Sequence, residues 1–163
     1  MEASTSVKSA VTAAQVMTRE VLTVEADWPV ERLVEFLTNH SISGAPVVSA
    51  ARKPIGVVSL TDIARNGALG EHRTSETHGF YRNELSSKVA RDEMRGLHVE
   101  TESTTTVGDI MTPLVFSVAE DATVQEVAAA MITGRIHRVF VTRAGALVGI
   151  ISAMDLLPLV RDM

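Results

Sequence analysis

The feature that most constrains this chain is an internal repeat, because the second half of the sequence copies the first. When the chain is shifted by 94 residues, Met17-Thr18 falls on Met111-Thr112. After one deletion in the second copy, the heptapeptide GVVSLTD (56–62) falls on GIISAMD (149–155). Each copy has about 55 residues, a length at which a unit seldom buries enough surface to be stable alone. The repeat therefore predicts two similar units that bury their faces against each other.

Both copies show the same order of local patterns. A short strand pattern precedes a helix whose apolar residues recur at i, i+3, i+4 and i+7, and two strands and a closing helix follow. Threonines with Gln or Asp three residues later (12–15 and 106–109) indicate a short capped helical turn before each copy. The expected order is β-α-β-β-α twice, an α/β (α+β) fold, with strands at 21–24, 46–50, 55–59, 115–118, 139–143 and 147–152, and closing helices from Asp62 and Asp155.

The repeat also divides the chain along its length. We expect residues 1–66 to hold an N-terminal cap and the first repeat, 67–103 to form a linker, and 104–163 to hold the second repeat. The linker ends in a run compatible with a helix (79–96). This run is either a surface helix docked by Tyr81, Leu85 and Val89, or a lid or partner contact that uses Phe80, Tyr81 and Arg82.

Composition narrows the functional classes. The formal net charge of −5 and the single Trp and Tyr argue against a groove for single-stranded nucleic acid. The chain has no cysteine, and its five histidines show no paired ligand spacing, so we expect no metal site. The first residues do not form a signal peptide, and the most apolar tract (144–160) is too short to cross a bilayer. We therefore expect a cytoplasmic protein without membrane insertion.

The duplicated heptapeptide has a structural and a functional interpretation. In the structural one, the glycine gives a turn its backbone freedom, and Ser59 and Ser152 form caps with aspartates three residues later. In the functional one, a strand that ends in serine and leads into a helix offers free N–H groups to an anion. An ionised aspartate one turn later accepts hydrogen bonds from both hydroxyls of a ribose. Duplication within matched repeats favours a nucleotide site.

The doubled unit resembles a tandem pair of CBS domains, the modules named after cystathionine β-synthase. The resemblance is carried by the two Met-Thr pairs, by SISGAPVV (41–48) and RIHRVFVT (135–142), and by both heptapeptides. It implies two repeats packed about a pseudo-twofold axis, with two clefts that bind AMP, ADP or ATP. It also implies a regulatory sensor without catalysis, a homodimer, and an unknown protein target.

The resemblance assigns a role to each matching residue. The two aspartates would hold ribose hydroxyls, the serines and Thr61 would lie near ribose or phosphate, the threonines of the Met-Thr pairs would line the cleft edge, and two valines would touch adenine. The residues before each second strand would offer groups to base or phosphate. The candidate ligand-binding residues are Thr18, Val21, Ile42, Ser43, Gly44, Ser59, Thr61, Asp62, Thr112, Val115, Ile136, His137, Arg138, Ser152, Met154 and Asp155.

The second copy carries basic residues that the first copy lacks. His137-Arg138 stands where the first copy has Ser43-Gly44. The guanidinium of an arginine is a strong partner for phosphate. We expect this pair to serve the cleft that contains Asp62. The alternatives are a surface ion pair for Arg138 and an ordinary polar role for His137.

The second copy also departs from the family pattern. Met154 replaces Thr61 and removes a hydroxyl from the ribose edge, and Phe140 replaces Pro46. We therefore expect the cleft with Asp155 to be empty or to prefer another ligand, and rank the other cleft as the better nucleotide site.

Two other functional interpretations stay open. The same fold with empty clefts would act as a scaffold through protein contacts, and the clefts could take NAD or S-adenosylmethionine. The motifs of phosphate loops, dinucleotide folds and serine hydrolases are absent from the sequence, so we expect no enzyme activity. No cofactor is required on this interpretation, although Mg²⁺ could accompany a bound ATP.

Overall fold

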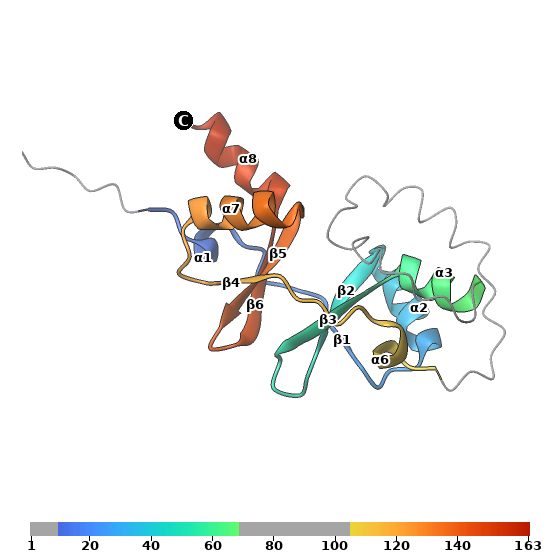
Figure 1. Cartoon of the computed structure of the whole chain (residues 1–163). Coiled ribbons are helices and arrows are strands. Elements are labelled where there is room, and N and C mark those ends of the chain that lie inside the picture. Colours follow the sequence, from blue (N-terminus) through green and yellow to red (C-terminus); the bar gives the residue numbers. More distant parts are fainter. Residues whose placement is uncertain (1–9, 69–104) are drawn as a thin grey trace, which may run out of the picture.

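The structure is a computed structural model of the 163-residue chain and describes residues 10–68 and 105–163. Figure 1 shows two halves side by side, each with a small sheet and helices. The expected linker helix, including Phe80, Tyr81 and Arg82, lies outside the described residues. Among the described helices, none is long and apolar enough to cross a membrane.

The described elements follow one order twice: a short helix, a strand, a helix, two strands and a helix. Residues 10–68 contain α1 (Ala13–Val16), β1 (Val24–Glu25), α2 (Val30–His40), β2 (Gly44–Val48), β3 (Pro54–Ser59) and α3 (Leu60–Ala68). Residues 105–163 contain α6 (Val107–Ile110), β4 (Ser117–Ala119), α7 (Val124–Gly134), β5 (Arg138–Arg143), β6 (Ala146–Ser152) and α8 (Ala153–Arg161). The predicted order and fold class are confirmed.

Each half forms a three-stranded sheet. β1 lies parallel to β2, which pairs antiparallel with β3, and β4, β5 and β6 repeat this arrangement. The expected first strands at 21–24 and 115–118 were placed too early, because β1 and β4 begin only at Val24 and Ser117 and the chain before them is still crossing between the halves. The closing helices begin two residues before their aspartates, because the serine that precedes each helix forms its cap.

The short helices are exchanged between the halves. The Ala13 N–H at the start of α1 donates to the carbonyl of Ala122, which precedes α7, at 2.7 Å. The Val107 N–H at the start of α6 donates to the carbonyl of Trp28, which precedes α2, at 2.8 Å. Each structural unit therefore contains the short helix of the other sequence copy: α1 packs with the second sheet and α6 with the first.

Two crossing segments follow from this exchange. We call residues 18–23 strap 1 and residues 112–116 strap 2. Strap 1 leaves β6, where Thr18 pairs with Ile150, and leads into β1 of the first sheet. Strap 2 leaves β3, where Thr112 pairs with Val57, and leads into β4 of the second sheet. The two straps cross the middle of the molecule in opposite directions (Figure 1).

Two apolar clusters stabilise this arrangement. One lies between the first sheet and its helices and includes Val58, Leu33 and Leu37. The other contains the second sheet and α7, and it also contains Val57 from the first sheet. Because successive side chains of a strand point to opposite faces, β3 contributes one valine to each cluster. The second cluster therefore fills the layer between the two sheets.

The β2–β3 and β5–β6 hairpins touch at one end of this layer. The Leu147 N–H donates to the Arg52 carbonyl at 2.9 Å. Both strands β3 and β6 run from this end to the helices α3 and α8 at the other end. The helix starts with their heptapeptides therefore lie away from the contact between hairpins.

Candidate ligand-binding site

The first heptapeptide places its aspartate at a helix start. Ser59 ends β3, and Asp62 lies in the first turn of α3. The Ser59 N–H donates to Asp62 Oδ2 at 2.7 Å, and the Ser59 hydroxyl donates to the same oxygen at 3.0 Å. These two bonds fix the orientation of the carboxylate and stabilise the start of the helix.

The second heptapeptide repeats this geometry. The Ser152 N–H donates to Asp155 Oδ2 at 2.7 Å, and the Ser152 hydroxyl donates at 2.9 Å, within a capping box. The predicted pairing of serine and aspartate at both helix starts is confirmed, with the aspartate accepting from the serine N–H. It does not compete with a ligand role, because these hydrogen bonds all use Oδ2 and a carboxylate has two acceptor oxygens.

The electrostatic environment of Asp62 opposes its ionisation. Burial raises the pKa of Asp62 above its usual value, because a charged carboxylate loses water contacts there. The hydrogen bonds from Ser59 and the positive charge of Arg65 lower the pKa and offset part of this effect. A ligand that donates hydrogen bonds to the carboxylate would favour its ionised form further.

We call residues 42–44 and 59–62 the Asp62 junction. The Leu60 N–H donates to the Ser43 carbonyl at 2.9 Å, and Gly44 lies directly opposite Ser59 in the sheet. The side chain of Thr61 is exposed. The start of β2 and the start of α3 therefore meet at one end of the first sheet, with small or hydroxyl-bearing side chains.

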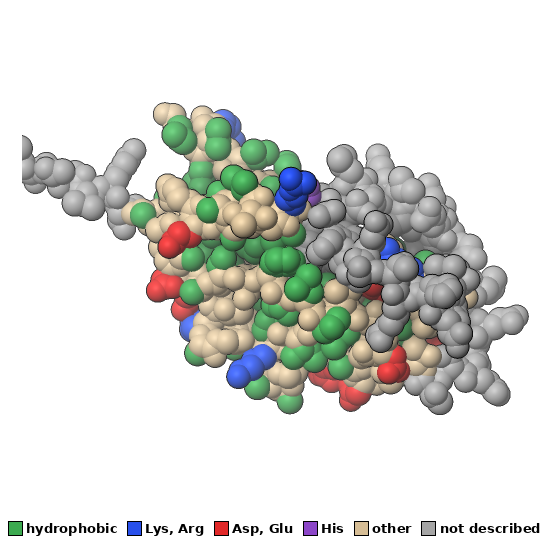
Figure 2. Space-filling model, viewed as in Figure 1, with side chains coloured by type: hydrophobic (Ala, Val, Ile, Leu, Met, Phe, Trp, Pro, Cys, Tyr) green, Lys and Arg blue, Asp and Glu red, His purple; other side chains and the backbone are tan. Residues whose placement is uncertain are grey.

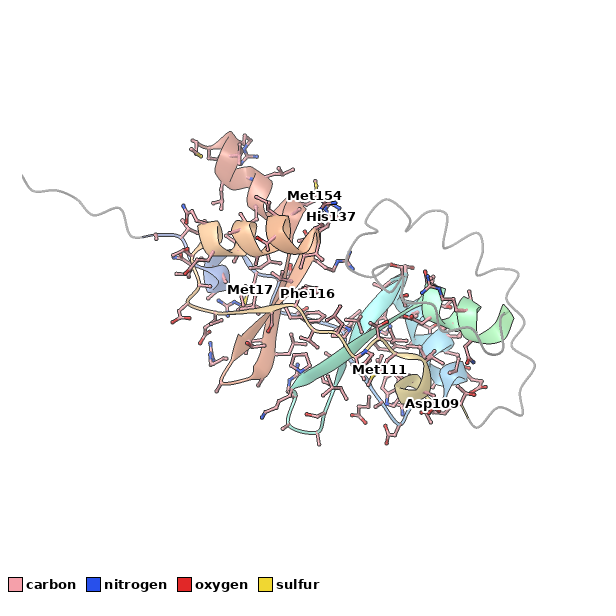
Figure 3. The ribbon with its side chains drawn as sticks, viewed as in Figure 1. Met17, Asp109, Met111, Phe116, His137 and Met154 are labelled. Atoms are coloured by element: carbon pink, nitrogen blue, oxygen red, sulfur yellow. The ribbon has the colours of Figure 1, made fainter. Side chains whose placement is uncertain are left out.

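We call residues 136–138 and 152–155 the Asp155 junction. The Ala153 N–H donates to the His137 carbonyl at 2.8 Å, and Arg138 lies directly opposite Ser152. His137 and Met154 are exposed at this end of the second sheet (Figure 3). The backbone matches that of the Asp62 junction, but the side chains are basic and apolar.

The backbone of His137 and Arg138 belongs to the Asp155 junction. Their proposed service to the cleft of Asp62 therefore requires side chains that extend across the layer between the sheets. That assignment stays a prediction. The remaining residues of the two turns hold them against the apolar clusters: Ile42 packs on the first cluster and Ile136 is buried in the second.

Strap 1 carries Thr18 and Val21. Thr18 and Ile150 exchange two backbone hydrogen bonds, so Thr18 lies at the edge of the second sheet. Strap 1 then enters the first sheet at β1, where Val24 pairs with Val47 of β2, and Val21 is half-buried against the second apolar cluster. Strap 1 therefore extends from the sheet that carries the Asp155 junction to the sheet that carries the Asp62 junction.

Strap 2 carries Thr112 and Val115 in the same way. Thr112 and Val57 exchange two backbone hydrogen bonds at the edge of the first sheet. Continuing the parallel register of β4 back from Ser117 brings Val115 level with Arg138. The contact of Val21 and Val115 with adenine stays a prediction.

The glycines of the heptapeptides need a different explanation from the predicted one. Gly56 and Gly149 lie inside β3 and β6 and have no positive φ, so the expected turn conformation is wrong. A Cβ on Gly56 would lie 2.6 Å from the Thr112 carbonyl oxygen, and one on Gly149 would lie 2.8 Å from Cγ of Met17. The glycines are needed because a strap anchor passes directly over each strand.

The sequence reasoning missed this contact, although the signal was available. The Met-Thr pair and the heptapeptide glycine are both kept in the two copies, at offsets of 94 and 93 residues. Residues that contact each other in the fold would be kept together in this way. Figure 3 shows Met17 and Met111 at equivalent places in the two halves. The described residues contain no group of three or more His, Asp or Glu side chains placed to bind a metal ion.

The sequence pattern of the CBS domain matches residues 13–68 and 107–162, the two repeats described above. The chain belongs to the CBS domain family. Its tandem arrangement, with two similar sheets and exchanged short helices, is that of a CBS pair, as the sequence predicted.

Solved structures show the same fold for CBS pairs. The CBS domain pair of protein MJ0100, in complex with 5'-methylthioadenosine and S-adenosyl-L-methionine, is 20% identical with a TM-score of 0.62, over 94% of this chain and 98% of that one. CBSX2 in complex with AMP is 20% identical with a TM-score of 0.63, over 93% and 97% of the two chains.

Curated relatives match over a short segment. An L-aspartate semialdehyde sulfurtransferase of Methanocaldococcus jannaschii is 39% identical over 51 residues, which is 31% of this chain and 10% of that protein. The match therefore covers about a tenth of that enzyme, a segment the size of one CBS repeat. The activity in its name belongs to the whole protein.

Proposed function

We propose that this CBS pair is a non-catalytic regulatory module that binds an adenine nucleotide (AMP, ADP or ATP) and signals by changing its conformation. The observation that carries the proposal is the Asp62 junction. There, a carboxylate held by Ser59 lies at a helix start beside the exposed Thr61, and Ser59 is paired with Gly44, which has no side chain. This set of groups suits a ribose with an attached phosphate.

Each part of the junction has a defined role in this proposal. Asp62 would accept the ribose hydroxyls through Oδ1, because Oδ2 is held by the cap. Thr61 would donate its hydroxyl to ribose or phosphate, and Val21 of strap 1 would pack against the adenine ring. Such binding would draw the strap and the helix start together, which gives a change of conformation.

The phosphate end of the ligand calls for positive charge. Arg138 and His137 are the candidates, with side chains extending across the layer between the sheets to the Asp62 junction. With ATP, Mg²⁺ would bind to the phosphate oxygens, and no resident cofactor is needed. No group in this account moves a proton or breaks a bond, so the ligand would leave unchanged.

The comparisons support an adenosine-bearing ligand without choosing one. AMP is bound by CBSX2, and S-adenosyl-L-methionine and 5'-methylthioadenosine are bound by the CBS pair of MJ0100. The alternatives are therefore S-adenosylmethionine or NAD in the same clefts. A scaffold with empty clefts, acting only on a protein target, is the remaining alternative.

Thermal unfolding tests the proposal. AMP, ADP, ATP, NAD and S-adenosylmethionine are each added to the whole chain and to Asp62→Asn. A ligand at 100 times its dissociation constant adds about 2.7 kcal/mol to the free energy of unfolding, and the midpoint should rise by several degrees. The rise should be smaller in Asp62→Asn. If none of the five ligands raises the midpoint of the wild type, the scaffold is the correct interpretation.

We also propose that the module forms a homodimer through α8. Met154, Leu157 and Val160 form an apolar stripe with exposed fractions of 60%, 52% and 68%, and Figure 2 shows hydrophobic side chains on the surface of this helix. The matching positions of α3 are Thr61, Ala64 and Gly67. The expected mass in sedimentation equilibrium is that of a dimer for Ala64→Glu and of a monomer for Leu157→Glu. A monomeric wild type would contradict this proposal.

A further inference from the structure

Each strap is anchored on the heptapeptide of the opposite junction. The Thr18 N–H donates to the Ile150 carbonyl at 2.9 Å, and the Ile150 N–H donates to the Thr18 carbonyl at 3.0 Å. Ile150 is the second residue of the heptapeptide that ends in Asp155. Strap 1, which enters the first sheet at Val24, is thus bound to the motif of the Asp155 junction.

Strap 2 shows the reciprocal arrangement. The Thr112 N–H donates to the Val57 carbonyl at 2.8 Å, and the Val57 N–H donates to the Thr112 carbonyl at 2.9 Å. Val57 is the second residue of the heptapeptide that ends in Asp62. Strap 2 carries Val115 to the Asp155 junction. Each sheet that carries a junction is therefore entered by a strap tied to the motif of the other junction.

The anchors are tightly packed. Met17, directly before the Thr18 anchor, is 8% exposed and lies against Gly149. Met111, directly before the Thr112 anchor, lies against Gly56. The space beside each glycine is occupied by the strap anchor. Because little free space remains there, displacement of a strap should also move the strand that it packs on.

The far end of strap 1 is also well held, and both straps contact the apolar core. Val24, where strap 1 enters the first sheet, is fully buried in the cluster under α2. Val21 and Val115 both pack on the cluster in the layer between the sheets, which also contains Val57. Movement of one strap is thus opposed by contacts on both sheets.

We propose that the two junctions are energetically coupled through the straps, so that an adenosine ligand at one junction changes the affinity of the other. The proposal rests on the proposed function, since it concerns ligands of the same two junctions. By linkage, the effect on affinity must be equal in both directions. Each strap provides the differential contact that such coupling requires, because its anchor lies on the heptapeptide of one junction and its far end enters the sheet that carries the other.

The first test needs no ligand. Thr18→Pro removes the backbone donor of the anchor, and Thr18→Ala removes the same hydroxyl but keeps both backbone bonds. Hydrogen exchange is followed at the Leu60 amide, which is bonded to Ser43 in the Asp62 junction. We expect exchange at Leu60 to be at least about fivefold faster in Thr18→Pro than in Thr18→Ala, because about fivefold is the smallest effect that typical coupling between two sites produces.

The Leu147 amide serves as the internal control, because it is bonded to Arg52 at the hairpin end. Its exchange should change much less than that of Leu60. Equal exchange at Leu60 in both variants, with faster exchange at Ile150 in Thr18→Pro, would overturn the proposal. If Thr18→Pro shows no cooperative unfolding, Met17→Ala is used in its place, because loss of the Met17 side chain loosens the same anchor at Gly149. Faster exchange at Leu60 again supports the coupling, and unchanged exchange at Leu60 again contradicts it.

The second test uses AMP and Asp155→Asn, in which only the Asp62 junction retains its carboxylate. Added AMP should slow exchange at Leu60 and also alter exchange at Ile150 on the opposite sheet. Slower exchange at Leu60 with no change at Ile150 would contradict the coupling but leave the proposed function intact. If AMP changes neither amide and raises no midpoint, the proposed function fails for AMP, and the comparison without ligand still decides the coupling.

Discussion

The two junctions share one backbone and differ in their side chains. In each, a serine donates its N–H and its hydroxyl to one oxygen of an aspartate at distances of 2.7–3.0 Å. The Asp62 junction offers a glycine and a threonine hydroxyl where the Asp155 junction has Arg138 and Met154. The repeated motif thus builds the helix start and orients the carboxylate, and under the proposed function the residues that differ between the junctions would set the preference for a ligand.

The strap anchors differ in the same way. The glycine of β3 is approached by the carbonyl oxygen of Thr112, whereas the glycine of β6 is approached by the side chain of Met17. A side chain can move aside, but a backbone carbonyl that is part of a hydrogen-bonded bridge cannot. The first anchor should therefore tolerate substitution less well than the second.

The largest expected effect is on stability. Gly56→Ala should lower the free energy of unfolding by about 3 kcal/mol, and Gly149→Ala by roughly 1 kcal/mol, because overpacking costs more against backbone than against a flexible side chain. Urea unfolding of the two variants and the wild type measures this difference. Equal losses would show that the two anchors are equally rigid.

An intermediate effect is expected from exchanging the residue before each aspartate. Thr61→Met should weaken AMP binding by about 1 kcal/mol, the contribution of one neutral hydrogen bond. Met154→Thr should leave the Asp62 junction unchanged and serves as the matched control. Titration calorimetry with AMP measures both. Unchanged affinity in Thr61→Met would show that the Thr61 hydroxyl does not contact AMP.

The smallest effect is on the pH dependence of stability. Because the folded chain raises the pKa of Asp62 above 3.8, the unfolded chain ionises first as pH rises. The contribution of Asp62 to stability should therefore fall as pH rises from 3.8 to the raised pKa, and stay constant above it. Urea unfolding of wild type and Asp62→Asn across this range isolates the effect. A difference that grows with pH would contradict burial as the dominant cause.

Local patterns in the sequence were sufficient for most of the fold. The apolar spacing that predicted helices from Val30 and Val124 is confirmed by α2 and α7, because such a stripe must face a core. The paired aspartates at helix starts were also predicted, since caps depend on residues only three positions apart.

The exchange of α1 and α6 could not be predicted in this way. Both short helices carry the same capping pattern, so either would fit the sheet of its own copy or that of the other. The choice depends on tertiary contacts, such as the hydrogen bond from Ala13 to Ala122. The role of the glycines was missed for a related reason, because a close approach between distant segments shows only when the two repeated motifs are compared and not in any local pattern.

Calorimetric titration of AMP into wild type, Asp62→Asn and Asp155→Asn tests the central claim most directly. Loss of a charged acceptor costs about 1.5–3 kcal/mol, so Asp62→Asn should weaken binding by roughly tenfold to a hundredfold, with a smaller change in Asp155→Asn. Equal or reversed losses would contradict the assignment of the nucleotide to the Asp62 junction. Unchanged binding in both variants would show that neither carboxylate holds the ribose.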